Sequence, residues 1–171
     1  TLVRSAGHSG DGLDMAEEVG AAVVSCGEVM LNPYAHPQYH IVGHIIGDTG
    51  NPLVVNKEGK RFVNETGKRT DLALAVMDQP DQLCYIIACD QNSNIMPDGR
   101  NFDGEPAEGL FENGLAYRAD TLDELADQID IPASALKKTV EEYNAACVAG
   151  VPDEFGRTYF EETAPIVEGP F

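Results

Sequence analysis

Residues 121–150 carry the clearest signals for secondary structure in the chain. Thr121 followed three residues later by Glu124 forms a capping-box pattern, which predicts that a helix begins directly after Thr121. Pro132 then opens a second predicted helix, and Gly150 is expected to end it. This second helix carries an apolar stripe with helical spacing, made of Leu136, Val140, Tyr143 and Cys147.

Two further elements are predicted before residue 70. Residues 10–22, GDGLDMAEEVGAA, have apolar positions near helical spacing, and they predict a helix of about three turns with Asp11 as its N-cap. In residues 52–65, PLVVNKEGKRFVNE, apolar residues flank a polar turn centred on Glu58 and Gly59. This pattern predicts a β-hairpin.

The remaining segments complete an α+β pattern. Residues 70–79 predict a short helix, and the apolar run CYIIAC at 84–89 predicts a buried strand. The stretches 26–50 and 90–109 are rich in glycine, proline, asparagine or aspartate and are expected to be loops. No βαβ unit repeats, and the glycine-rich residues 7–12 do not spell G-x-G-x-x-G, so a doubly wound nucleotide-binding fold is not predicted.

Composition limits the partners of the chain. With 171 residues, 43% of them hydrophobic, one compact domain is expected. The net charge of −18 opposes binding to nucleic acid and to anionic lipid surfaces. No apolar run approaches the ~18 to 20 residues of a membrane-spanning helix, so this piece is expected to be soluble. Because it begins at Thr1 without a start methionine, the sequence is interpreted as part of a longer protein, either cytoplasmic or exported from a bacterium.

A metal site is considered and not predicted. His36, His40 and His44 are spaced four residues apart, which on one face of a helix would suit zinc. Pro37 and Gly43 argue against a continuous helix there, and the four cysteines lack C-x-x-C spacing. Substrate hydrogen bonding and ordinary loop packing stay equally open for these histidines.

Basic residues are rare in this chain, and four of them cluster within ten positions. They are Lys60, Arg61, Lys68 and Arg69. Arg61 has Glu58 and Glu65 as nearby candidate partners, and an exposed pair of that kind contributes only ~0 to 1 kcal/mol. The alternative is that an arginine at the mouth of a pocket grips a carboxylate substrate with its planar guanidinium group.

Five segments, in order along the whole chain, resemble the FAD-dependent flavoproteins related to fumarate reductase, succinate dehydrogenase and soluble flavocytochrome c. The segments are GDGLDMAEEVGA at 10–21, HPQY at 36–39, VVNKEGKRFVNE at 54–65, the predicted helix pair with the Asp-x-Phe-Gly-Arg motif at 120–157, and the terminal Pro170-Phe171. The resemblance is to the substrate-capping domain of that family. It implies a linker helix in residues 1–25 and a capping domain in residues 26–171.

The resemblance also implies the partners of the chain. FAD would be bound mainly by a flavin-binding domain of the same polypeptide that lies outside this sequence. The substrate would be a small unsaturated acid, and a cytochrome or a reduced flavin carrier would donate the electrons. The chain alone is therefore expected to be inactive.

Arg69 is the catalytic residue that the resemblance implies. It stands four residues after Glu65, at the spacing of the family's proton-donating arginine. In the implied reaction, reduced flavin passes a hydride to one carbon of a polarised double bond and this arginine protonates the neighbouring carbon. Substrate-binding groups are expected at His36, His40, His44 and Asp48.

The expected proton relay departs from the fumarate reductases of the family. Those enzymes carry a glutamate and an arginine about two dozen residues before the catalytic arginine, where this sequence has Ile45 and Asp48. A relay replaced by His44 or Asp48, and a substrate other than fumarate, are therefore expected. Two alternatives stay open: the cap of a ketosteroid-type dehydrogenase, and a non-catalytic module that binds a metal or a partner protein.

Overall fold

The computed structural model contains five α-helices and two strands among the residues that it describes. These residues are 9–24, 27, 30–36, 53–93, 95–101, 104, 106–158 and 164–171. The helices are α1 (Asp11–Glu18), α2 (Arg69–Met77), α3 (Glu108–Glu112), α4 (Leu122–Gln128) and α5 (Ala133–Ala149), and the strands are β1 (Leu53–Val55) and β2 (Tyr85–Ile87). A short 3₁₀ turn, η1 (Pro80–Gln82), separates α2 from β2. This mixture agrees with the predicted α+β class.

The predicted hairpin at 52–65 is wrong in one of its two arms. β1 pairs antiparallel with β2, with Leu53 opposite Ile87, and residues 61–64 form no strand. The polar turn itself is present, because the N–H of Asn56 donates to the carbonyl of Lys60. β1 is completely buried. The apolar side chains of β2 cover it better than the residues after the turn would, because residues 61–64 are only half-buried.

The turn after β1 lies directly against the start of α5. Gly59 has a φ of 73°, and a Cβ atom on it would lie 3.0 Å from the backbone nitrogen of Leu136. The hydroxyl of Thr139 donates to the carbonyl of Gly59 at 2.7 Å, within the buried interior. Glycine is needed here because the backbone conformation is left-handed and because the helix approaches so closely.

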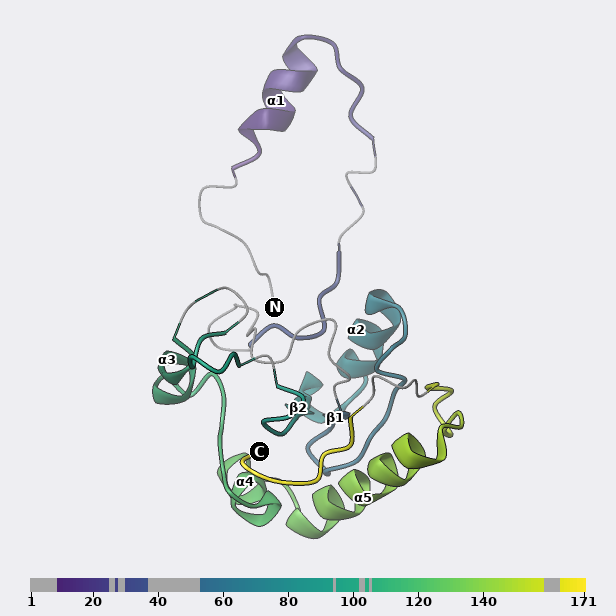
Figure 1. Cartoon of the computed structure of the whole chain (residues 1–171). Coiled ribbons are helices and arrows are strands. Elements are labelled where there is room, and N and C mark those ends of the chain that lie inside the picture. Colours follow the sequence, from purple (N-terminus) through teal and green to yellow (C-terminus); the bar gives the residue numbers. More distant parts are fainter. Residues whose placement is uncertain are drawn as a thin grey trace.

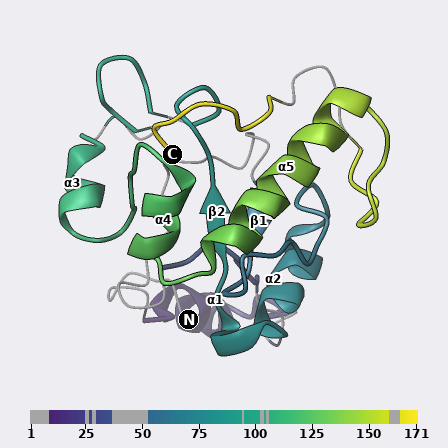
Figure 2. The ribbon, with the colours of Figure 1, turned by 90° about the horizontal axis from the view of Figure 1, so that it is seen from below.

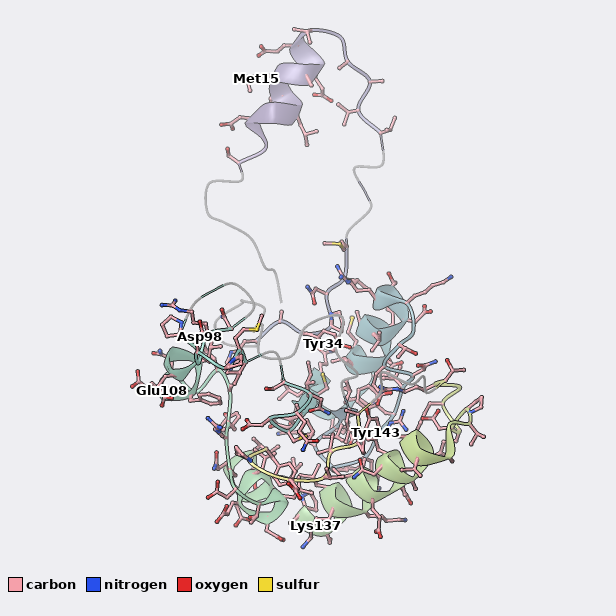
Figure 3. All side chains as sticks on the ribbon, viewed as in Figure 1. Met15, Tyr34, Asp98, Glu108, Lys137 and Tyr143 are labelled. Carbon is pink, nitrogen blue, oxygen red and sulfur yellow. The ribbon has the colours of Figure 1, made fainter. Side chains whose placement is uncertain are left out.

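α4 and α5 pack against the sheet and form the main core, as seen from two directions in Figures 1 and 2. Both bonds of the predicted capping box are present, between Thr121 and Glu124, and Gly150 ends α5 with a φ of 63°. Leu136, Val140 and Tyr143 of the predicted stripe are buried. Lys137 lies on the outer side of α5, whereas Tyr143 points inward (Figure 3).

The C-terminal segment closes this core. The backbone groups of Phe171 and Ala119 exchange two hydrogen bonds, and the side chain of Asn144 on α5 bonds both backbone groups of Ile166. Ile166 is 2% exposed. This irregular segment is thus fixed by hydrogen bonds rather than by secondary structure.

α1 differs from the other helices because it buries no residue. It stands away from the rest of the described chain in Figure 1, with Met15 far from the core in Figure 3. Its N-cap is Gly10 and not Asp11, which instead lies in the first turn, and the helix is shorter than predicted. An acidic residue in the first turn favours the helix through the macrodipole.

Sequence reasoning missed α3, which begins at Glu108 at the end of the predicted loop 90–109. A helix of five residues shows too few apolar repeats to be recognised from periodicity. None of the described helices is long and apolar enough to cross a membrane.

Candidate active site

A buried ionic network lies between the segment after β1 and the segment after α5, and Glu65 is at its centre. The side chain of Glu65 is fully buried. Its carboxylate accepts two bonds from Arg61, both at 2.7 Å, and one from Arg157 at 3.0 Å. The N–H of Val54 on β1 donates to it as well, at 3.3 Å. A buried carboxylate with this many donors is fixed in both position and orientation.

Arg61 joins this network to a second carboxylate and to aromatic rings. One of its Nη atoms pairs with Asp153, and its guanidinium carbon lies 4.9 Å from the centre of the Phe155 ring and 5.8 Å from that of Tyr143. Of the two candidate partners of Arg61, Glu65 is the one with which it pairs, and the expected exposure of the pair is wrong, because only 9% of the Arg61 side chain is exposed. The small energy of exposed pairs does not apply to it.

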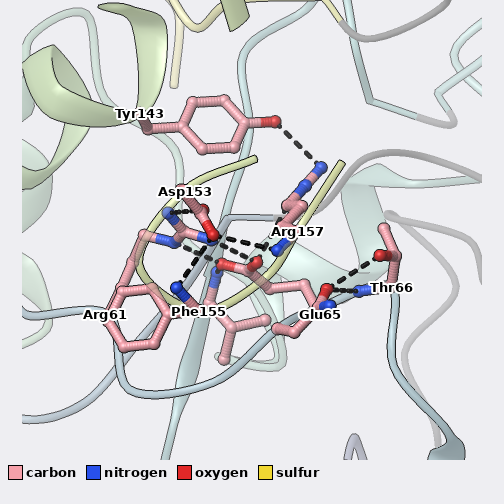
Figure 4. A network of polar contacts seen from close by, with 9 residues as sticks. Arg61, Glu65, Thr66, Tyr143, Asp153, Phe155 and Arg157 are labelled. Carbon is pink, nitrogen blue, oxygen red and sulfur yellow. Dashed lines mark hydrogen bonds and ion pairs between the residues drawn. The ribbon is translucent and has the colours of Figure 1, made fainter. Parts of the chain in front are cut away.

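Arg157 completes the network from the far end of the chain. Its side chain is 0% exposed, stacks on the Tyr143 ring and donates to the hydroxyl of Tyr143 at 3.3 Å. Figure 4 shows Arg61 and Arg157 both directed at Glu65. The two arginines balance the formal charges of Glu65 and Asp153. The network thus joins the Arg-Phe-Val-Asn-Glu motif to the Asp-x-Phe-Gly-Arg motif, which lie 92 positions apart at Glu65 and Arg157.

Arg69, the predicted catalytic residue, is the first residue of α2 and is exposed. A tight turn leads to it from Glu65. Asn64 stabilises this turn, because its side-chain oxygen accepts from both the N–H and the hydroxyl of Thr66, and its carbonyl accepts from the N–H of Gly67. One Nη of Arg69 lies 3.9 Å from the sulfur of Met30. Arg69 therefore extends a long cationic side chain from a backbone position that the hydrogen bonds of this turn fix.

His36 lines a cavity of about 480 Å³ beside β2. The cavity has mostly apolar walls, contributed by β2, α3 and the C-terminal Phe171, with Tyr34, Tyr117 and Arg118 among its polar lining groups. Arg69 is not among the residues that line it. The structure thus places the two predicted site residues that it describes, His36 and Arg69, in different surroundings.

The other predicted substrate-binding residues, His40, His44 and Asp48, lie outside the described residues, as does Ile45. Within the described part of the chain, no three histidine, cysteine or acidic side chains are grouped to hold a metal ion.

Burial raises the pKa of the Cys84 thiol, which also lines the cavity, from 9.0 to about 12. Between these values the folded chain keeps a proton that the unfolded chain loses, so the free energy of unfolding is expected to fall as pH rises above 9. Between pH 8.5 and 10.5 the loss assigned to Cys84 is about 2 kcal/mol. Urea unfolding of the unaltered chain and of Cys84→Ala at both pH values measures this difference. The free energy of unfolding should fall more between the two pH values in the unaltered chain than in Cys84→Ala.

Cys147→Ala is the matched control for this measurement. Burial raises the pKa of Cys147 too. A hydrogen bond from Tyr143 and the charges of Arg157 and Arg61 offset part of this rise. A smaller change of slope is therefore expected. If the free energy of unfolding falls equally with pH in the unaltered chain and in Cys84→Ala, the expected role of Cys84 is wrong.

Comparison with known proteins places the chain in a family. Residues 1–171, its whole length, match the family described as the FAD binding domain, FAD_binding_2. The chain belongs to this family. The cofactor of this family, FAD, is the one that the motif resemblance implies.

Several of the curated relatives are reductases whose names specify unsaturated acids, and two others are 3-oxosteroid 1-dehydrogenases, at 28% and 27% identity. The chain is 37% identical over 165 residues to the NADH:acrylate oxidoreductase of Vibrio harveyi, covering 94% of the chain and 16% of that protein. It is 31% identical to the NADH:fumarate oxidoreductase of Klebsiella pneumoniae, covering 96% and 17%, and 29% identical to the urocanate reductase of Eggerthella lenta, covering 98% and 27%. The chain thus spans between about a sixth and a quarter of the length of these FAD-family relatives. The resemblance to the fumarate reductase family is confirmed.

Two solved structures share the fold. The open conformation of a flavocytochrome c3 fumarate reductase aligns with a TM-score of 0.68 at 27% identity, covering 94% of this chain and 27% of that one. The 3-ketosteroid Δ1-dehydrogenase of Sterolibacterium denitrificans aligns with a TM-score of 0.65 at 21% identity, covering 98% and 34%. The second likeness concerns the fold alone.

The described residues do not fit FAD as a self-contained site. Phosphate cradles in dinucleotide-binding folds combine a parallel strand, a glycine turn and the start of a helix. Among the described residues, the sheet consists of two antiparallel strands, and the N-terminus of α1 at Gly10 is exposed to solvent. The cavity beside β2 has mostly apolar walls and presents no glycine-rich turn.

Proposed function

We propose that this chain is the substrate-capping part of an FAD-dependent oxidoreductase that reduces an activated carbon–carbon double bond, most simply that of an unsaturated carboxylic acid. The observation that carries the proposal is the relationship to three reductases whose named substrates, acrylate, fumarate and urocanate, are all unsaturated acids. Flavin in the parent protein supplies the hydride. This chain supplies the proton and part of the substrate pocket.

Arg69 is the proposed proton donor. Two features support this role: the exposed position of Arg69 at the first residue of α2, and the short turn that connects it to the buried carboxylate of Glu65. An arginine is normally too basic to lose a proton, so this role requires a relay that returns the proton to the guanidinium group and a closed, dry pocket. His44 or Asp48 is the proposed replacement for the relay, and His36, His40, His44 and Asp48 are the proposed substrate-binding groups.

The domain boundary is part of the same proposal. Residues 1–25 would be a linker helix from the flavin-binding domain, and residues 26–171 the capping domain. The absence of buried residues in α1 supports this division, as do the exposed apolar side chains of Leu13 and Met15 within the helix and of Val19 at its C-cap. Those side chains would pack against the remainder of the parent protein.

Anaerobic reoxidation of reduced flavin in the intact parent tests the proposed function. Acrylate, fumarate, urocanate and other unsaturated acids would be added in turn, with the saturated acids as matched controls. Fast reoxidation by at least one unsaturated acid is expected. If every acid fails and a 3-ketosteroid instead reduces the oxidised flavin, the parent is a dehydrogenase and the proposed direction of reaction is wrong.

A further inference from the structure

The position of Arg69 depends on a residue from the far end of the chain. Glu65 lies four residues before Arg69, and the turn between them leaves little freedom because Asn64 holds both Thr66 and Gly67. α2 begins directly after this turn. The carbonyl of Lys68 accepts the N–H of Leu72, and Leu72 is 4% exposed.

Arg157 holds the other end of this connection. It donates to Oε2 of Glu65 at 3.0 Å, and the hydroxyl of Tyr143 holds its second Nη at 3.3 Å. The same Oε2 accepts from Arg61 at 2.7 Å, so Glu65 is held from two sides. A displacement of Arg157 would leave the carboxylate of Glu65 with one arginine, and the turn that follows would lose part of its anchor.

We propose that Arg157 is a positioning residue, which acts through Glu65 to hold the origin of Arg69 where its guanidinium group meets the substrate. This inference rests on the proposed function of Arg69. The side chain of Arg157 is fully buried, so it does not itself contact a substrate or deliver a proton. Small errors in the placement of a catalytic group cost large factors in rate, because the reacting atoms must meet within a few tenths of an ångström.

Arg157→Lys in the flavin-loaded parent protein tests the proposal. Lysine keeps the positive charge, but its side chain is shorter and lacks the planar guanidinium group whose two Nη atoms bond Glu65 and Tyr143. We expect kcat to fall about 10- to 100-fold, with KM changed less than about threefold. Arg100→Lys is the matched control, since Arg100 pairs with Asp98 on the surface, where both side chains are more than half exposed; its kcat should stay within about twofold.

A double-variant comparison separates positioning from general structural damage. If Arg157 acts through Arg69, then Arg157→Lys should have little further effect on the residual rate of Arg69→Lys. If the fold-losses in kcat of the two single variants multiply in the double variant, the proposal is overturned. So would an unchanged kcat in Arg157→Lys while Arg69→Lys is inactive. An active Arg69→Lys would instead contradict the proposed role of Arg69 as the proton donor, on which this inference rests.

If Arg157→Lys does not fold, as judged by its flavin content, Tyr143→Phe is the variant that tests the proposal. It removes only the hydroxyl that holds Arg157 and keeps the ring beneath both arginines. About a threefold fall in kcat is expected, and it should disappear in the Arg69→Lys background. A kcat equal to that of the unaltered parent would overturn the proposal.

Discussion

Arg69→Lys is expected to lower kcat for the unsaturated acid in the parent protein by about 10²- to 10⁴-fold, the range that a positioned general acid contributes. Lysine keeps the charge, so non-specific attraction of the acid is retained. Its ammonium group is a compact point charge on a shorter side chain, however, and it cannot reach the same point from the first residue of α2. The measurement is the rate of anaerobic flavin reoxidation at saturating acid.

Arg100→Lys is the control for this prediction too, because Arg100 is exposed and lies outside the proposed site. The flavin spectrum and the urea midpoint of both variants should match those of the unaltered protein. If Arg69→Lys reoxidises flavin as fast as Arg100→Lys does, Arg69 is not the proton donor. The reductase proposal would then need another acid from the pocket.

Arg157→Met should lower the free energy of unfolding of the chain by about 3 to 5 kcal/mol, the usual cost of removing one partner from a buried ion pair. Methionine fills much of the same space but leaves Glu65 and Asp153 with Arg61 as the one remaining arginine of the network. The network then carries an uncompensated negative charge inside the protein. Urea unfolding monitored by circular dichroism measures the difference.

Lys137→Met is the matched control for charge removal. Lys137 pairs with Asp123 at 2.7 Å, but half of its side chain and more than half of that of Asp123 are exposed. A change within about 1 kcal/mol is expected. If Arg157→Met and Lys137→Met cost the same, burial of the network does not determine its contribution to stability.

The elements with strong local signals were predicted from the sequence. The capping box at Thr121 and Glu124 and the C-terminal Gly150 specify α4 and α5 through hydrogen bonds and a backbone conformation that belong to a few neighbouring residues. The apolar run that contains β2 was recognised as a strand, but its predicted burial holds fully only for Ile87, because Tyr85 and Ile86 are half-buried.

The strand pairing could not be predicted in this way. The turn at Glu58 and Gly59 favoured a local hairpin, but the partner of β1 is β2, about thirty residues later. Local turn chemistry identifies where the chain reverses, and it does not identify which apolar segment then covers the strand. Sequence reasoning also treated Arg61 as an exposed partner of Glu65, because burial of that pair depends on Tyr143, Phe155 and Arg157.

The sequence by itself determined the family, the helices of the core and the position of Arg69 four residues after Glu65, because motifs, caps and apolar periodicity are local properties of the chain. Only the tertiary structure decided that Arg61, Glu65, Asp153 and Arg157 form one buried network. The physical reason is that a buried charge is tolerated only where partners meet it in the interior, and those partners come from segments that are distant in sequence.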